Sequence, residues 1–318
     1  MKTIPMSSKS LALAALAALT LTLQAGSATA ASASAAANQP TASVGQTAAV
    51  DSTAATKVVN QYEALLKSGK LPKAISYLND HIDEVSTYQA TIMVLHLENA
   101  VKKALPSMVD RIGKTSVQAK INKVYKYGDN FADVIKRTND KALKALLQEA
   151  ADSGFKLETA EGFYFPVVRY ATLQKYNAYV TADIKAYMDI MTVESEKANM
   201  KDAALMIGYQ ELVNRALSQE RFVKQFPSSN RTAQVKQLFN SYKILTFYGV
   251  NNTPLFDYDT KVIQPNAKKG YSLILQWNKP ESSAYLTTLD KFMKLLADQN
   301  YKLTAEVEKF RKANVPIQ

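Results

Sequence analysis

Apolar side chains recur every three or four residues along most of the chain, which is the spacing of a helix with one buried side. The first such segment begins near Thr53, carries Val58, Tyr62 and Leu65, and ends at Gly69. Further segments of this period start at residue 71 and cover residues 87–105, 139–152, 180–197, 201–225, 232–248, 282–298 and 304–313. The pattern predicts an all-α fold over residues 53–318, built as packed helical hairpins or an irregular helical bundle.

The helical pattern breaks near the middle of the chain, over residues 155–170. Phe163 and Phe165 alternate with Tyr164, while Gly162 and Pro166 disfavour a helix. We predict an extended segment or a short β-hairpin here, where two helical lobes would meet. Pro106 is expected to end the helix before it for the same reason.

The composition favours helices and removes several kinds of chemistry. Only 10 of 318 residues are glycine, fewer than a turn-rich fold needs, and 47% are hydrophobic. The chain has no cysteine, which excludes thiol nucleophiles, thiolate zinc sites and iron–sulfur clusters. Nucleotide-binding glycine motifs and the serine-hydrolase motif are also absent from the sequence. We expect no cofactor, and these absences favour a protein that is not an enzyme.

The first thirty residues have the organisation of a secretory signal peptide. Lys2 and Lys9 precede an apolar run over residues 11–23, and Ala28 and Ala30 offer a cleavage site. The run is shorter than the roughly 20 residues that a membrane span needs, although an uncleaved anchor is the alternative. Residues 31–52 are rich in Ala, Ser and Thr and are predicted to be a disordered spacer. We expect a secreted or extracytoplasmic protein, associated with a bacterial cell envelope.

Two stretches resemble tetratricopeptide-type helical hairpins. In residues 62–70 a helix that contains Tyr62 is followed by a turn at Gly69, and Ala74 and Leu78 lie in the next helix. Residues 221–229, which contain Pro227, resemble the end of such a repeat. The resemblance covers about a quarter of the chain. It implies hairpin packing of the helices and specifies no ligand.

The last third of the chain is basic. Residues 221–318 contain 15 basic and 7 acidic residues, a net charge of +8, while the whole chain carries +11. This imbalance predicts attraction to an anionic cell-wall polymer, a membrane surface or another envelope protein, and no nucleic acid partner is expected. The predicted binding face consists of Lys268, Lys269, Lys291, Lys294, Lys309, Arg311 and Lys312. The alternative is that these side chains only solvate helix surfaces.

Tyrosines gather around the central break. Tyr164, Tyr170 and Tyr187 could line a groove for a sugar or a peptide, because a tyrosine ring stacks while its hydroxyl group makes a hydrogen bond. Alternatively, these tyrosines pack at helix ends. The sequence alone allows both arrangements.

Carboxylates are the remaining acid–base groups. Glu161 precedes the aromatic run, where burial would raise its pKa, and Asp183 in the first turn of the central helix could supply a second carboxylate. Asp189, Glu194 and Glu196 on or near the same helix are further candidates for this second carboxylate, although they are expected to face solvent. An envelope glycan hydrolase using Glu161 as general acid is therefore the alternative to a non-enzymatic binding protein, which is the leading hypothesis.

No metal site is predicted. His96 has no partner at helical spacing, and His81, flanked by Asp80 and Asp83, is expected to be a surface residue near a helix end. The loop with Asp257 and Asp259 lacks the glycine and distal glutamate of a helix–loop–helix calcium site.

Overall fold

The computed structural model describes residues 52–317. The predicted signal peptide and nearly all of the predicted spacer lie outside these residues. Within the described part of the chain, no helix is long and apolar enough to cross a membrane.

The first half of the described chain contains helices and one β-hairpin. The elements are α2 (Ser52–Lys67), α3 (Leu71–His81), α4 (Thr87–Ile112), α5 (Thr115–Asn122), α6 (Phe131–Arg137), α7 (Lys141–Asp152), β1 (Phe155–Ala160), β2 (Phe163–Val168), α8 (Ala171–Gln174) and α9 (Ala182–Glu196), with a 3₁₀ turn at Ile82–Glu84. Capping residues stand where the sequence pattern changes. Ser86 caps α4 with a reciprocal capping box to Gln89, and Asp140 accepts a hydrogen bond from the backbone N–H of Leu143.

The second half is also helical. Its elements are β3 (Met200–Lys201), β4 (Ala204–Leu205), α10 (Tyr209–Gln225), α11 (Thr232–Tyr248), β5 (Gly249–Val250), β6 (Thr253–Pro254), α12 (Pro265–Trp277), α13 (Ala284–Asp298) and α14 (Ala305–Asn314), with a 3₁₀ turn at Pro280–Ser282. The three sheets each consist of two antiparallel strands. The predicted all-α fold with a short hairpin at 155–170 is therefore confirmed.

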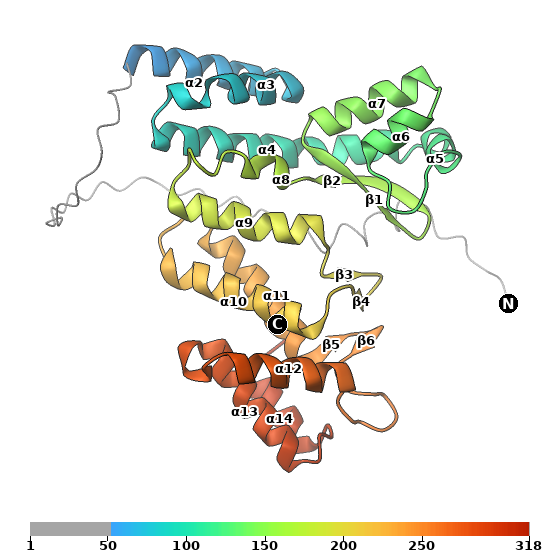
Figure 1. Cartoon of the computed structure of the whole chain (residues 1–318), viewed down its shortest axis with the longest axis vertical. Coiled ribbons are helices and arrows are strands. Elements are labelled where there is room, and N and C mark those ends of the chain that lie inside the picture. The colour runs from blue at the N-terminus through green and yellow to red at the C-terminus, as the bar shows by residue number, and fades with distance from the viewer. Residues whose placement is uncertain (1–51, 318) are drawn as a thin grey trace, which may run out of the picture.

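The helices are stacked in layers along one axis (Figure 1). The α2–α3 hairpin lies at one end, followed by α4, α9, the α10–α11 pair and finally α12, α13 and α14. The β1–β2 hairpin and α5, α6 and α7 project from one side of the first half. The first stretch that resembles a tetratricopeptide-type hairpin lies in the α2–α3 pair, where Gly69 adopts φ of +70° between the helices. The second, residues 221–229, forms the end of α10 and the turn before α11.

Two separate hydrophobic cores hold the stack together. The first core extends from Ala55 to Met191 and also takes Phe222 of α10 and Val235 of α11. The second core extends from Ile207 to Val315. The cores therefore meet at the α10–α11 pair. The predicted meeting point at 155–170 is wrong, because both strands of that hairpin pack within the first core.

Two predicted helix boundaries are also wrong. Pro106 lies inside α4, which continues to Ile112 because Met108 and Ile112 are buried in the first core. Residues 201–208, expected to begin the next helix, instead contain the β3–β4 turn. Asp202 and Ala203 both adopt positive φ there, so α10 starts only after Gly208.

Candidate functional site

A buried carboxylate, Glu98 of α4, joins three layers of the stack. Its side chain has no exposed surface and forms ion pairs with Lys102 at 2.5 Å and with Arg231 at 2.7 Å. It also accepts hydrogen bonds from the hydroxyl groups of Tyr170 at 2.7 Å and Tyr187 at 2.5 Å. Burial pushes the pKa of Glu98 upward, but the charges of Lys102 and Arg231 outweigh burial and hold this pKa below its ordinary value.

This arrangement corrects the groove predicted from the tyrosines. Tyr170 and Tyr187 are 1% and 0% exposed, so neither lines an open groove, and both pack in the first core with their hydroxyl groups on Glu98. Tyr164 is also buried, and its hydroxyl group donates to the side-chain oxygen of Asn122 at 3.0 Å. All three tyrosines are therefore packing residues, and Tyr170 and Tyr187 complete the buried polar cluster around Glu98.

The two carboxylates of the hydrolase hypothesis lie on different elements. Glu161 is exposed at the turn of the β1–β2 hairpin, with φ of 50°. Asp183 accepts a hydrogen bond from Ser229 at 2.6 Å in the first turn of α9. Burial acts to raise the pKa of Asp183, but the hydrogen bonds from Ser229 and its neighbours hold it below its ordinary value. The burial that motivated Glu161 as a general acid is therefore not present.

The predicted basic face divides into paired and unpaired side chains. Lys294 pairs with Asp290 at 2.7 Å, and Lys312 pairs with Glu308 at 3.4 Å. Arg311 is only 7% exposed, pairs with Glu308 and lies over the ring of Tyr248, so it belongs to the second core and not to a surface. Lys269, Lys291 and Lys309 are exposed and form no ion pair with any residue in 52–317.

Four lysines lie on adjoining segments at the α12 end of the stack. The ammonium group of Lys268 lies 3.3 Å from the ring centroid of Tyr301. The next residue, Lys302, is on the segment that pairs with residues 261–262, where the Leu303 N–H donates to the Lys261 carbonyl at 2.8 Å. We name Lys261, Lys268, Lys269 and Lys302 the lysine cluster. None of these four forms an ion pair within the described chain, although Asp257 lies in the same loop with its carboxylate bound to the turn.

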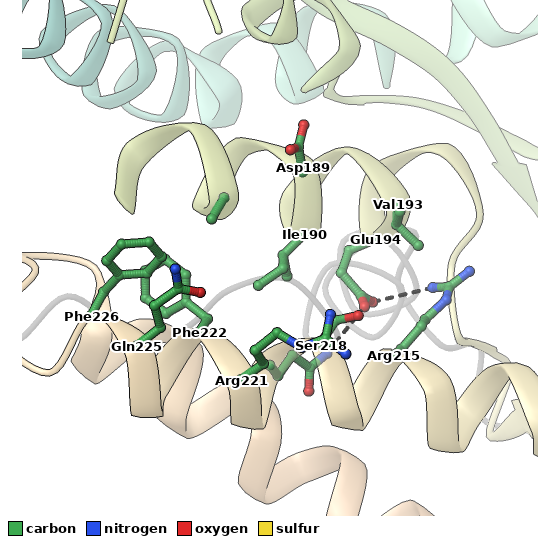
Figure 2. Close-up of a pocket in the computed structure, with 12 residues that line it drawn as sticks. Asp189, Ile190, Val193, Glu194, Arg215, Ser218, Arg221, Phe222, Gln225 and Phe226 are labelled. Carbon is green, nitrogen blue, oxygen red and sulfur yellow. Dashed lines mark hydrogen bonds and ion pairs between the residues drawn. The ribbon is translucent and has the colours of Figure 1, made fainter. Parts of the chain in front are cut away.

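A pocket of about 260 Å³ lies between α9 and α10 (Figure 2). Apolar side chains form much of its wall, including Ile190 and Val193 from α9, Phe222 from α10 and Phe226 directly after it. The two phenylalanine rings are tilted against each other with centroids 5.4 Å apart. Asp189 belongs to the lining, but its carboxylate points away from the pocket.

The floor of the pocket is a buried polar network. The carboxylate of Glu194 accepts from the Tyr242 hydroxyl group at 2.7 Å, from the Gln219 amide nitrogen at 3.3 Å and from Arg215 at 3.4 Å. Burial raises the pKa of Glu194 above its ordinary value despite the hydrogen bond from Tyr242 and the charge of Arg215. The amide oxygen of Gln219, a residue with 0% exposure, has no hydrogen-bond partner among residues 52–317. A buried acceptor without a hydrogen-bond donor lowers the free energy of unfolding by about 1–3 kcal/mol.

Neither buried glutamate agrees with the sequence predictions, because Glu98 is not among the predicted site residues and Glu194, expected to face solvent, is only 6% exposed. Glu194 lies one turn after Ile190 and Met191, and two turns after Tyr187, so the helical period places it on the buried side of α9. Glu98 lies in the same way between Val94 and Val101 on the apolar side of α4. A charged residue in register with an apolar stripe was the available signal.

The described chain contains no group of three or more His, Asp or Glu side chains that could hold a metal ion. His81 and His96 each lie 2.6 Å from a glutamate, Glu84 and Glu63 respectively.

Searches against protein-family models, curated proteins and solved structures gave no match.

Proposed function

We propose that this chain is an exported, non-enzymatic binding protein of a bacterial cell envelope, held on an anionic wall polymer by its basic C-terminal third. The lysine cluster is the observation that carries this proposal. It gathers positive charge from three segments, and its members form no ion pair within residues 52–317. At about 0.15 M salt the Debye length is about 8 Å, so only cations gathered on one surface add to each other's attraction.

The lysine cluster replaces the binding face predicted from the sequence. It keeps Lys268 and Lys269, adds Lys261 and Lys302, and leaves out the buried Arg311 and the paired Lys294 and Lys312. Lys291 and Lys309 lie on other elements, α13 and α14. This difference provides a test in which the number of charges removed is constant and only their position changes.

The test is a pull-down of the purified protein on isolated cell walls over a series of salt concentrations. The triple variant Lys261→Gln, Lys268→Gln and Lys302→Gln should bind more weakly by a factor of about ten or more, because each lysine near an anionic surface contributes about 1 kcal/mol. The matched control, Lys291→Gln, Lys294→Gln and Lys309→Gln, has the same net charge and should bind nearly as the unmodified protein does.

Equal loss in both triple variants would mean that net charge and not the lysine cluster drives attachment. Binding that survives about 1 M salt would contradict an electrostatic attachment altogether. Binding to anionic vesicles in place of walls would point to a membrane surface as the partner.

The alternative is an envelope glycan hydrolase that uses Glu161 as general acid. Glu161 is exposed, so the burial that suggested this role is absent. It is checked by incubating the protein with peptidoglycan and measuring released fragments. Turnover that Glu161→Gln abolishes in a folded protein would overturn the non-enzymatic proposal.

A further inference from the structure

We infer that the α9–α10 pocket binds a small ligand that combines an apolar body, an N–H donor and a carboxylate, such as the carboxyl end of a short peptide whose last residue is apolar. The pocket is distinct from the lysine cluster, which lies on other elements, so the two proposals can fail separately. Figure 2 shows the pocket opening between the two helices, with Glu194 and Arg215 at one end and Phe222 and Phe226 at the other.

The N–H donor of the ligand is inferred from the unpaired Gln219 amide oxygen at the floor of the pocket. The Gln219 amide nitrogen faces the Glu194 carboxylate, which leaves the amide oxygen without a donor from residues 52–317. Gln219 itself lines the pocket. A ligand N–H group is therefore the complement that this buried oxygen lacks.

The apolar part of the ligand is inferred from the apolar side chains in the pocket wall. Ile190, Val193, Phe222 and Phe226 offer aliphatic and aromatic surface, and Val193 is 46% exposed although it is large and hydrophobic. A volume of about 260 Å³ is below the range of about 300–1,000 Å³ for drug-sized ligands, so one apolar side chain with its flanking groups suits it.

The carboxylate of the ligand is inferred from the charges of the side chains that line the pocket. Arg215 pairs with Glu211 at 2.5 Å and lies 3.4 Å from Glu194, so its charge is compensated. The Asp189 carboxylate accepts hydrogen bonds from Gln174 and Asn177 at 2.9 and 2.8 Å. Arg221 lines the pocket, is exposed and forms no ion pair with any described residue. The pocket therefore presents one uncompensated cation, whose guanidinium group suits a carboxylate.

The experiment titrates the purified protein with three probes and measures affinity by calorimetry. N-acetylphenylalanine carries all three groups, its primary amide lacks the carboxylate, and its N-methylated form lacks the N–H donor. We expect millimolar binding of the acid and at least about fivefold weaker binding of each of the other two.

Variants assign each preference to a side chain. Arg221→Gln should abolish the preference for the acid over the amide, and Gln219→Leu should abolish the preference for the N–H probe over the N-methylated probe. Lys224→Gln is the matched control, because Lys224 is an exposed cation of α10 outside the lining and should leave both preferences intact.

The probe series on the unmodified protein decides the matter even where Gln219→Leu does not fold. Equal affinity for all three probes, or no binding up to about 10 mM, overturns the inference. Loss of the acid preference in Lys224→Gln would equally overturn it, because general charge would then explain the effect.

Discussion

At the scale of single residues, two buried glutamates in neighbouring networks have opposite protonation behaviour. Glu98 is held by two cations and two hydroxyl groups, which favour the ionised form against its burial. Glu194 has one cation at 3.4 Å, and burial dominates. The number and closeness of the cations therefore decide the direction of each pKa shift.

Replacing Glu98 with Gln should lower the free energy of unfolding by about 3–5 kcal/mol, because it leaves the Lys102 and Arg231 charges without their carboxylate in the core. Urea denaturation measures this. The control is Glu149→Gln, which removes a carboxylate from the exposed pair with Arg111 and should cost at most about 1 kcal/mol. Similar losses in the two variants would contradict the role given to the Glu98 network.

The raised pKa of Glu194 predicts a pH dependence of stability. The folded protein keeps a proton on Glu194 that the unfolded chain has released, so its stabilising contribution is complete below about pH 4.5 and is lost as the pH rises through the folded pKa. Relative to Glu194→Gln, the unmodified protein should therefore lose stability above about pH 4.5, by at most about 1.4 kcal/mol per pH unit.

Denaturation of both proteins over a pH series checks this prediction. Asp183→Asn is the internal comparison, because the lowered pKa of Asp183 predicts a contribution that is lost as the pH falls. Parallel stability profiles for the unmodified protein and Glu194→Gln would show that Glu194 does not titrate differently in the folded state.

At the scale of elements, the β1–β2 hairpin depends on its two-residue turn. Ala160 pairs with Phe163, and the residues between them, Glu161 and Gly162, both have positive φ, at 50° and 75°. Positive φ at both positions is the geometry of a type I′ turn, which matches the twist of the strands. Glu161 is therefore explained as a turn residue.

Gly162→Ala should lower the free energy of unfolding by about 1 kcal/mol, because a Cβ atom disfavours positive φ. Glu161→Asn should have no cost or raise stability slightly, since asparagine is favoured in this turn. Thermal melting of both variants measures the effect, and a destabilising Glu161→Asn would contradict the turn assignment.

The sequence predicted elements better than it predicted the site. Helix α11 begins and ends at the predicted residues, and the central helix buries Ile184, Tyr187, Met188 and Met191 as expected, because local periodicity determines both. Pro106 misled the prediction, since burial of distant Ile112 outweighs a missing backbone donor. The pocket and the lysine cluster depend on which helices pack together, and local periodicity does not contain that information.

At the scale of the whole molecule, the two cores share the α10–α11 pair. Phe222 and Val235 belong to the first core, whereas other residues of the same helices belong to the second, and Leu238 packs against both. If one core unfolded and displaced α10 and α11, the apolar side chains that these helices contribute to the other core would also be exposed. We therefore expect the cores to unfold together.

Leu97→Ala in the first core tests this coupling and should cost about 2–5 kcal/mol. The fluorescence of the single tryptophan, Trp277, reports on the unfolding of α12, whose buried side belongs to the second core, although Trp277 itself is 66% exposed at the end of that helix. Circular dichroism reports on all helices. Both signals should shift to the same lower urea midpoint. A shift in circular dichroism that leaves the Trp277 transition unchanged would mean that the cores unfold independently.

The stacking of the layers along one axis has a consequence for a protein that is held at one end. The α2–α3 hairpin and the α12–α14 layer lie at opposite ends of the stack, and the lysine cluster belongs to the latter (Figure 1). A polymer bound there would orient the molecule upright, so that its length becomes a distance from the attachment surface. The α2–α3 hairpin would then stand outermost, with the α9–α10 pocket at an intermediate height.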